Sequence, residues 1–444
     1  MNLSIKSATE QKAHALLELN WRKGYTIPSH RLYPFQWNWD AGFIALGWWY
    51  INPARAIEEI NTMFSGQWKN GMLPHINFIH PDDNYFPGPE VWKTNNLAHG
   101  PSIPTSGITQ PPVFGFILQR LHNLQQNKDD AWRSFLKAIL PKVINFHRYL
   151  YTYRDPFNEG LVYIQHNWES GTDNSPLWDA IFENMDVSNA REVAHLRKDI
   201  KNVDAAERPT NENYKRYIHL VDLFAELQYN DVLIAKQSPF LVQDVLFNAM
   251  LVKSNLGIIA LLDWLNEDAT EIKQWNQKTI NALNTKCWDE ATGFYYAFDL
   301  NKNERINVKT SSGFMPLFAG VCNAQQAQQL IQVFNTHFAP SEQWKTCVST
   351  AIDEPAFNPL KYWRGPAWIN VNWMFYHGLK NYGFNALAER IKEDSLYLVE
   401  MHGMYEYFDA RPELDALTAR GIGADLFSWT AALYLDFIHN PQPL

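Results

Sequence analysis

The sequence has few cysteines and no segment that resembles a linker. Cys287, Cys322 and Cys347 are the three cysteines among 444 residues, and no Cys-x-x-Cys pair occurs. An odd and widely spaced set argues against a disulfide framework and against a zinc knuckle, and it is typical of a reducing compartment. No stretch rich in Gly, Ser or Pro divides the chain and no repeat is evident, which predicts a single domain over residues 1–444.

Charge and long hydrophobic runs are also scarce. Charged residues make up 19% of the chain, the net charge is −9, and no cluster of Lys or Arg stands out, so nucleic acid is not an expected partner. The longest apolar stretch, residues 41–51, is well short of the roughly 20 residues that span a bilayer. The first twenty residues lack the continuous hydrophobic core of a signal peptide. We expect a soluble cytoplasmic protein without a membrane partner; a homo-oligomer stays open.

Helical periodicity dominates the sequence. Trp132, Phe135, Leu136, Ile139 and Val143 recur at i, i+3, i+4 and i+7 spacing, which predicts one face of an amphipathic helix. Residues 241–265 are apolar around most of the helical circumference, as expected of a helix that is buried on several sides. Other helices are predicted near 41–50, 53–66, 113–125, 213–228, 268–284, 324–335, 366–380, 384–399 and 425–438.

Strand signals are few. Residues 294–300, followed by Asn301-Lys302-Asn303, predict a small hairpin, and residues 161–164 predict a short strand. About a dozen helical segments joined by long, aromatic-rich loops favour an all-α fold in which paired helices close into a ring. A helical solenoid is the alternative, but the irregular loops and the missing repeat count against it.

Aromatic residues are abundant, with 18 Trp, 20 Tyr and 26 Phe. Most of them are expected to fill a helical core. Many Trp lie instead in loops punctuated by Gly and Pro, where flat rings can pack against the C–H faces of sugars while Trp and Tyr edges donate hydrogen bonds. Four such segments also contain a carboxylate or an arginine.

The first of these segments, Tyr33 to Asp40, precedes a predicted helix. Asp40 stands where an N-cap carboxylate would. A cap does not explain Gln36, Trp37 and Trp39 beside it, so Asp40 is equally a candidate for binding ligand hydroxyls.

The second segment, residues 166–179, contains three carboxylates, two Trp, a Gly and a Pro. Ser175 and Pro176 suit the cap and the first turn of a following helix, whereas Asp173 has no such role. Neighbouring indoles and the like charge of Glu169 would raise the pKa of Asp173, as a general acid near neutral pH requires.

The third segment is residues 362–373, and the fourth is residues 404–408 followed, after a polar loop, by residues 427–430. Pro366 predicts the first turn of a helix, and Arg364 is a candidate for contacting an anion, with a structural salt bridge as the alternative. Glu406 lies within an alternating aromatic run, where an unpaired carboxylate would be costly to bury unless it is functional.

Other chemistries find less support. His75 and His80 lie five residues apart, without the i, i+4 spacing of a zinc-binding helix or a third ligand nearby. No Gly-x-Ser-x-Gly elbow and no phosphate loop occurs. We therefore expect no metal and no cofactor. Two isolated carboxylates in separate Trp-rich loops fit glycoside hydrolysis better than the alternatives.

Several motifs, in this order, resemble the bacterial branch of glycoside hydrolase family 63, in particular its mannosylglycerate and glucosylglycerate hydrolases. The resemblance runs from Tyr33 to Leu435. Its motifs are Arg31-Leu32-Tyr33-Pro34-Phe35-Gln36-Trp37, Gln67-Trp68, Leu73-Pro74-His75, Tyr85-Phe86-Pro87-Gly88-Pro89, Gly107-Ile108-Thr109-Gln110-Pro111-Pro112, Glu169-Ser170-Gly171-Thr172-Asp173-Asn174-Ser175-Pro176, Tyr362-Trp363-Arg364-Gly365-Pro366, Glu406-Tyr407-Phe408 and Phe427-Ser428-Trp429-Thr430.

This resemblance implies an (α/α)6 barrel, a six-hairpin toroid, that hydrolyses a small α-glycoside with inversion of configuration. The matching positions make Asp173 the general acid and Glu406 the general base that activates water, with the two carboxyl groups roughly 6.5–9.5 Å apart. The residues that would line the sugar subsite are Trp37, Trp39, Asp40, Gln110 and Trp363.

Residues 213–217 resemble the mobile loop of the family. The match implies that Tyr85, Arg216 and Tyr217 meet a glycerate carboxylate, and an Arg fork suits that planar anion. The remaining candidate substrate-binding residues in the matching motifs are Tyr33, Gln36, Arg364, Gly365 and Trp368.

One segment departs from the family pattern. Residues 410–420 replace a short Pro-x-Thr-Gly turn with a longer stretch, which leaves the pocket rim and the exact substrate open. A neutral α-glucoside is the alternative substrate. A non-catalytic carbohydrate-binding scaffold is a further alternative, but a scaffold has no need for two carboxylates in separate Trp-lined loops.

Overall fold

The computed structural model describes residues 3–95, 97–201, 203–412 and 420–439. Within them the fold is mostly helical, as predicted, and the cysteines are buried free thiols. The helices are α1 (Leu3–Asn20), α2 (Asn38–Ile51), α3 (Pro53–Ser65), α4 (Pro89–Trp92), α5 (Phe114–Leu124), α6 (Asp130–Tyr153), α7 (Asp179–Glu183), α8 (Asn211–Glu226), α9 (Asp231–Gln237), α10 (Val245–Leu265), α11 (Thr270–Ala282), α12 (Met315–Ala319), α13 (Ala324–Val333), α14 (Ile369–Asn381), α15 (Asn385–His402) and α16 (Ser428–His439).

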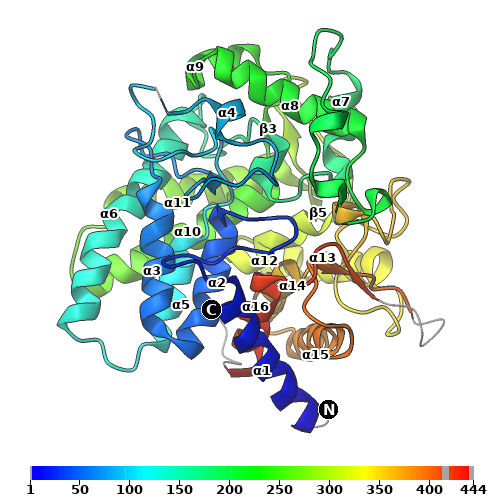
Figure 1. Cartoon of the computed structure of the whole chain (residues 1–444). Coiled ribbons are helices and arrows are strands. Elements are labelled where there is room, and N and C mark those ends of the chain that lie inside the picture. The colour runs from blue at the N-terminus through cyan, green and yellow to red at the C-terminus, as the bar shows by residue number, and fades with distance from the viewer. Residues whose placement is uncertain (1–2, 96, 202, 413–419, 440–444) are drawn as a thin grey trace.

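The helices form a closed inner ring with further helices packed behind it. In the part of the chain that the structure describes, α2, α5, α10, α12, α14 and α16 each contact the next, and α16 closes the inner ring against α2. Outer helices pack behind them, with α3 on α2, α11 on α10, α15 on α14, and α1 on α16. Figure 1 shows α1, from the start of the chain, beside α15 and α16 from its end. The fold is therefore the predicted (α/α)6 toroid.

The strands are two residues long and belong to loops. They are β1 (Gln36–Trp37), β2 (Ile76–Asn77), β3 (Val242–Gln243), β4 (Trp288–Asp289), β5 (Phe294–Tyr295), β6 (Phe298–Asp299), β7 (Glu304–Arg305), β8 (Tyr407–Phe408) and β9 (Gly421–Ile422). The antiparallel pairs are β1–β2, β3–β6, β6–β7, β4–β5 and β8–β9. The β6–β7 pair is the hairpin predicted around residues 301–303. The strand predicted at 161–164 is reduced to one bridge between Ile164 and Val242.

Most helix boundaries lie within a few residues of the prediction, and the exceptions have local causes. The helix predicted from Pro366 begins at Ile369, because the backbone of Trp368 at its N-cap is extended. α4, α7, α9 and α12 are four to seven residues long and were not predicted, since one or two turns give no measurable periodicity.

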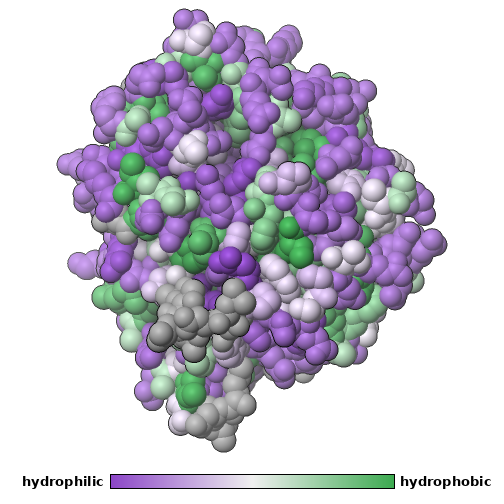
Figure 2. All heavy atoms as spheres, turned by 90° about the vertical axis from the view of Figure 1, so that its right-hand side faces the viewer, coloured by the Kyte–Doolittle hydropathy of each residue, from purple (hydrophilic) through white to green (hydrophobic). Residues whose placement is uncertain are grey.

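Helix α10 shows why an apolar helix need not contact lipid. Its length and hydropathy would suffice to cross a membrane, but 83% of the 18-residue window that meets this test is buried inside the protein. It contacts α5 and α12 in the ring and α11 behind it. The all-round apolar pattern of residues 245–265 is thus explained by packing on several sides. On the face shown in Figure 2, hydrophilic residues predominate and hydrophobic ones form small, scattered patches.

Candidate active site

Two adjoining cavities lie where inner helices begin. Asp40 is in the first turn of α2, Trp368 is the N-cap of α14, and Trp429 is in the first turn of α16. All three line the inner cavity. The long loops that lead into these helices therefore meet at one end of the ring, which explains why the aromatic-rich segments of the sequence converge. The positive ends of the helix dipoles also face this space.

The inner cavity is walled by aromatic side chains. Trp363 and Trp368 stack with their ring centroids 3.7 Å apart and 4° between their planes, which makes a rigid double layer. The space between these walls, counted out to the open mouth, is about 380 Å³. Its lining is Pro28, Tyr33, Trp37, Trp39, Asp40, His75, Gln110, Gly171, Asp173, Tyr362, Trp363, Trp368, Glu406, Phe427 and Trp429.

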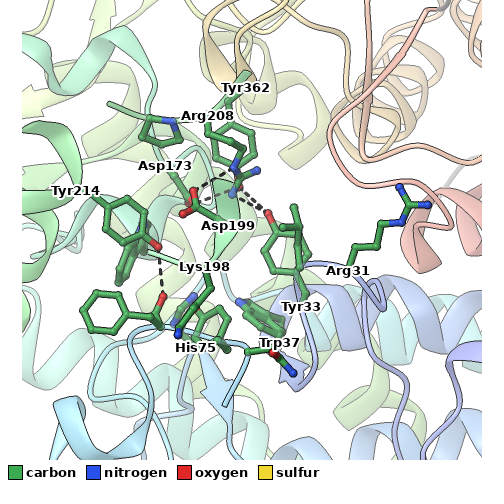
Figure 3. A pocket seen from close by; sticks show the side chains of 16 residues that line it. Arg31, Tyr33, Trp37, His75, Asp173, Lys198, Asp199, Arg208, Tyr214 and Tyr362 are labelled. Atoms are coloured by element: carbon green, nitrogen blue, oxygen red, sulfur yellow. Dashed lines mark hydrogen bonds and ion pairs between the residues drawn. The ribbon is translucent and has the colours of Figure 1, made fainter. Parts of the chain in front are cut away.

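The outer cavity, unlike the inner one, is lined by cationic side chains. Arg208 and Lys198 line it, together with the phenols of Tyr85 and Tyr214. Figure 3 shows Arg208 between Asp199 and Tyr33, whereas Arg31 extends away from the group. The full lining is Arg31, Leu32, Tyr33, Trp37, His75, Asn84, Tyr85, Phe86, Trp168, Asp173, Lys198, Asp199, Arg208, Pro209, Tyr214 and Tyr362.

Asp173 lies at the junction of the two cavities. Tyr33, Trp37, His75, Asp173 and Tyr362 line both of them. Glu406 lines only the inner cavity and Arg208 only the outer one. A molecule that fills both cavities would therefore pass Asp173 at the point where its two halves join.

The environment of Asp173 favours its protonated form. The Tyr362 hydroxyl donates a hydrogen bond of 3.1 Å to Oδ2, and Asn167 Nδ2 donates one of 2.7 Å to the backbone carbonyl. Burial, aided by the like charge of Glu406, raises the pKa of Asp173 to about 7, although Arg208 and Tyr362 oppose the rise. A carboxyl with this pKa can hold and release a proton near neutral pH, which is the property of a general acid.

Glu169 is not the like charge that raises this pKa, so that part of the sequence interpretation was wrong. Its carboxylate forms a buried, two-pronged ion pair with Arg154, with distances of 3.0 and 3.1 Å. It also accepts hydrogen bonds from the backbone N–H groups of Thr109 and Gln165. Glu169 thus anchors the loop that presents Asp173.

Glu406 lies deeper in the site, just before β8. Its side chain is buried, and its oxygens accept hydrogen bonds from the Tyr33 hydroxyl at 2.7 Å and the Ala424 N–H at 3.1 Å. Arg208 Nη1 lies 3.6 Å from Oε2. Burial raises the pKa of Glu406 above its usual value, whereas the charge of Arg208 and these two hydrogen bonds favour the ionised form.

The two carboxyl groups are joined by two tyrosines. Tyr362 Oη is 3.1 Å from Asp173 Oδ2 and 3.3 Å from Tyr33 Oη, which in turn is 2.7 Å from Glu406 Oε1. The end oxygens can therefore be no more than about 9 Å apart. Both carboxyls face one small space.

Asp40 is a third carboxyl in the inner cavity, and it is not a helix cap. The N-cap of α2 is Trp37, and Asp40 lies in the first helical turn. Burial raises the pKa of Asp40 well above its usual value, with further contributions from the charges of Glu406 and Asp173. A protonated Asp40 offers one donor and one acceptor to a ligand hydroxyl.

Arg208 is the cation at the centre of the site, and the sequence analysis missed it. Its Nη2 donates a hydrogen bond of 3.1 Å to Tyr33 Oη, and its Nε lies 3.5 Å from Asp199. The guanidinium carbon is 4.2 Å from the ring centroid of Tyr362. Nε and Nη1 are buried, and the carboxylates that they face, Asp199 and Glu406, lie beyond the usual hydrogen-bond distance at 3.5 and 3.6 Å. Arg208 stands in the irregular segment between 201 and 210, which has no aromatic neighbours and so gave no signal.

Arg216 and Tyr217 line neither cavity, which corrects the prediction that they meet a carboxylate. Both are in α8, where Arg216 donates to the backbone carbonyls of Phe182 and Glu212 at 2.7 and 2.9 Å. Tyr217 is buried against Trp168 and Phe182. The residues of the same types that do line the outer cavity lie nearer the start of α8 and are Arg208 and Tyr214.

Three further candidates also lie outside the cavities. Gln36 is buried and donates to the Glu59 side chain at 2.7 Å. Arg364 pairs with Asp179, which is the structural salt bridge considered as the alternative. Gly365 lies where an added Cβ would meet the carbonyl of Asn358 at 2.4 Å, so its role is close backbone packing.

The segment that departs from the family pattern is only partly described, since residues 413–419 lie outside the described residues. Of the remainder, residues 410–412 and 420 line neither cavity. Among all described residues, no group of three or more His, Cys, Asp or Glu side chains is placed to hold a metal ion. His75 instead stacks on Trp168 at the junction.

Residues 33–430 match the family described as the mannosylglycerate hydrolase MGH1-like glycoside hydrolase domain. The chain belongs to this family. The mannosylglycerate hydrolase of Thermus thermophilus is 44% identical over 430 residues, which are 96% of this chain and 99% of that protein. The glucosylglycerate hydrolase of Mycolicibacterium hassiacum is 30% identical over 441 residues, 96% of this chain and 97% of that one.

Solved structures agree with the sequence relatives. The crystal structure of a family 63 mannosylglycerate hydrolase from Thermus thermophilus, in complex with Tris and D-glycerate, matches with a TM-score of 0.90 at 43% identity, over 97% of this chain and 100% of that one. The neutral trehalase of Saccharomyces cerevisiae, at 14% identity and a TM-score of 0.58, covers 93% of this chain and 73% of that one and shares the fold. This glycoside hydrolase thus belongs to family 63, as predicted.

Proposed function

We propose that this glycoside hydrolase cleaves an α-glycoside whose aglycone carries a carboxylate, namely mannosylglycerate or glucosylglycerate. The sugar occupies the inner cavity and the glycerate the outer one. The observation that carries the proposal is the position of Asp173 at the junction, with Glu406 on the sugar side and Arg208 on the other. The scissile bond then lies beside the group that is able to protonate it.

The reaction proceeds with inversion of configuration. Asp173 protonates the glycosidic oxygen while Glu406 removes a proton from a water molecule that attacks the anomeric carbon from the opposite face. The upper bound of about 9 Å between the carboxyl oxygens is compatible with an intervening water. The paired indoles of Trp363 and Trp368 offer a flat wall to the sugar ring.

The outer cavity supplies the groups that recognise the glycerate carboxylate. Arg208 and Lys198 provide positive charge, and Tyr85 and Tyr214 provide phenols beside it. Because the protein has a net charge of −9, an anionic substrate depends on these local cations. The names of the Thermus and Mycolicibacterium relatives support this substrate class, and we propose that the enzyme acts on such solutes in the cytoplasm.

The test is a hydrolysis screen of the purified protein against mannosylglycerate, glucosylglycerate and neutral α-disaccharides. We expect the glycerate-bearing substrates to have the highest kcat/KM, and we expect proton NMR of the first product to show the β-anomer of the sugar. A preference for a neutral disaccharide would refute the substrate assignment. An initial α-anomer would refute inversion.

Lys198→Met separates recognition of the carboxylate from catalysis. The side chain lines only the outer cavity. Its loss should raise KM for mannosylglycerate several-fold and leave an uncharged aryl α-mannoside unaffected. Arg208 is less suitable for this comparison, since it also lies 3.6 Å from Glu406.

A further inference from the structure

The proposed inverting reaction, on which this inference rests, leaves the catalytic carboxyls with their protonation states exchanged. Each turnover starts with Asp173 protonated and Glu406 ionised, and it ends with the reverse. Asp173 has given its proton to the leaving oxygen, and Glu406 has taken one from water. The next turnover requires a net transfer of one proton from Glu406 to Asp173.

Tyr33 and Tyr362 connect the two carboxyls through side-chain oxygens alone. The successive oxygen–oxygen distances from Glu406 are 2.7, 3.3 and 3.1 Å. Each lies within or close to the hydrogen-bonding range, and the middle one is the longest. Both tyrosines line the junction of the cavities, so the connection runs along the wall beside the reacting atoms.

The number of protons shared by these four side chains, Glu406, Tyr33, Tyr362 and Asp173, supports a relay. If both carboxyls are ionised, each phenol donates to its own carboxylate and the contact between Tyr33 and Tyr362 has no proton. If one carboxyl is protonated, three protons serve three links, and every link is a hydrogen bond. Two such arrangements exist. Either Glu406 or Asp173 holds the carboxyl proton, and the donor and acceptor of every link are exchanged between the two.

We propose that Tyr33 and Tyr362 return the proton from Glu406 to Asp173 after each turnover. The Glu406 O–H proton passes to Tyr33 Oη, the Tyr33 proton passes to Tyr362 Oη, and the Tyr362 proton passes to Asp173 Oδ2. Three O–H bonds break and three form. No charge is left on either tyrosine, and the catalytic pair regains its starting protonation.

Arg208 is positioned to assist this shift. It donates a 3.1 Å hydrogen bond to Tyr33 Oη and lies over the ring of Tyr362 at 4.2 Å. Burial raises the pKa of both phenols well above their usual value, so a free tyrosinate is disfavoured and the three protons move together. The nearby guanidinium stabilises the partial negative charge that develops on the phenol oxygens during the shift.

The competing route is exchange with solvent. At pH 8 the hydronium concentration is about 10 nM, and encounter at ~10⁹–10¹⁰ M⁻¹s⁻¹ supplies at most roughly 10–100 protons per second. Typical kcat values span about 1–10³ s⁻¹. An internal relay therefore makes turnover independent of the hydronium and buffer supply.

Tyr362→Phe breaks the relay next to the acid. The control is Tyr217→Phe, since Tyr217 is also buried near the site but lines neither cavity, and its hydroxyl makes no hydrogen bond within the described residues. Product formation from mannosylglycerate is followed by rapid quench at pH 8 in dilute buffer. Single turnover, with enzyme in excess, is measured beside multiple turnover.

We expect Tyr362→Phe to form product in a burst at those sites whose Asp173 starts protonated, followed by a steady-state rate at least about 10-fold slower that rises with buffer concentration. Wild type and Tyr217→Phe should show neither the burst nor the buffer dependence. Tyr33→Phe combined with Tyr362→Phe should slow the steady state no further than Tyr362→Phe alone, because one break already interrupts the chain.

Loss of single-turnover rate in proportion to kcat, without a burst, would overturn the relay and leave Tyr362 as a positioning residue. An unchanged steady state would overturn it as well. Failure of the proposed function is distinguishable, since it appears in the wild type as no turnover of either glycerate glycoside or as an α-anomeric product.

Discussion

Raising the pH tests the role of Asp173 quantitatively. The acid must be protonated to donate, and burial raises its pKa to about 7. Above that value the fraction of enzyme with a protonated Asp173 falls to about one tenth at pH 8 and about one hundredth at pH 9. Because kcat/KM reports the free enzyme, kcat/KM for mannosylglycerate should fall tenfold per pH unit on the alkaline side.

The acidic side of the profile follows from Glu406, which must be ionised. Its pKa is raised above the usual value, so activity should already decline while the pH is still above the usual pKa of a glutamate side chain. The expected profile is a narrow bell with its upper limb near pH 7. Arg208→Met should move the upper limb to higher pH, because the charge of Arg208 lowers the pKa of Asp173.

The assay is kcat/KM from initial rates between pH 4 and 9, with Lys198→Met as a matched control. That variant removes an outer-cavity cation and should keep the shape of the profile. A profile that stays flat from pH 6 to 9 would refute the protonated state of Asp173, and so would an upper limb that moves downward in Arg208→Met.

Three further outcomes follow from the same contacts. Arg154→Met should destabilise the fold by about 3–5 kcal/mol, measured by urea unfolding, because it leaves Glu169 buried without its partner; a change below 1 kcal/mol would contradict that anchoring role. Gly171→Ala should weaken activity at least tenfold, since φ is +73° and a Cβ would meet the Trp39 ring at 2.5 Å; wild-type kinetics would contradict it. EDTA should leave kcat unchanged, and a loss restored by a divalent cation would reveal a metal that the mechanism omits.

The individual helices could be predicted from local sequence signals, whereas the loops between them could not. The predicted helices match because three or more turns repeat their apolar spacing, whereas α12 spans five residues and left no pattern to detect. Which helices close the ring depends on contacts between α16 and α2, about 390 residues apart in the chain. The sequence alone offered pairing into a ring only as the better of two arrangements.

In the candidate site, too, some residues could be predicted from the sequence and others could not. Asp173 and Glu406 could be found because each is a carboxylate isolated among aromatic residues, and the structure brings both to one space. Arg216 was chosen for its side-chain type, but its position in α8 directs it to the carbonyl of Phe182. Arg208 lines the outer cavity, where the proposed carboxylate would bind, and its segment carries no periodicity from which that position could be inferred.

The most direct test of the central claim compares two substrates with Asp173→Asn. Mannosylglycerate needs a proton on its leaving oxygen, whereas α-mannosyl fluoride leaves without one. The variant should lose roughly 10²–10⁴-fold in kcat on mannosylglycerate and less than about tenfold on the fluoride, while Glu406→Gln should lose heavily on both. An equal loss on both substrates in Asp173→Asn would contradict its assignment as the general acid.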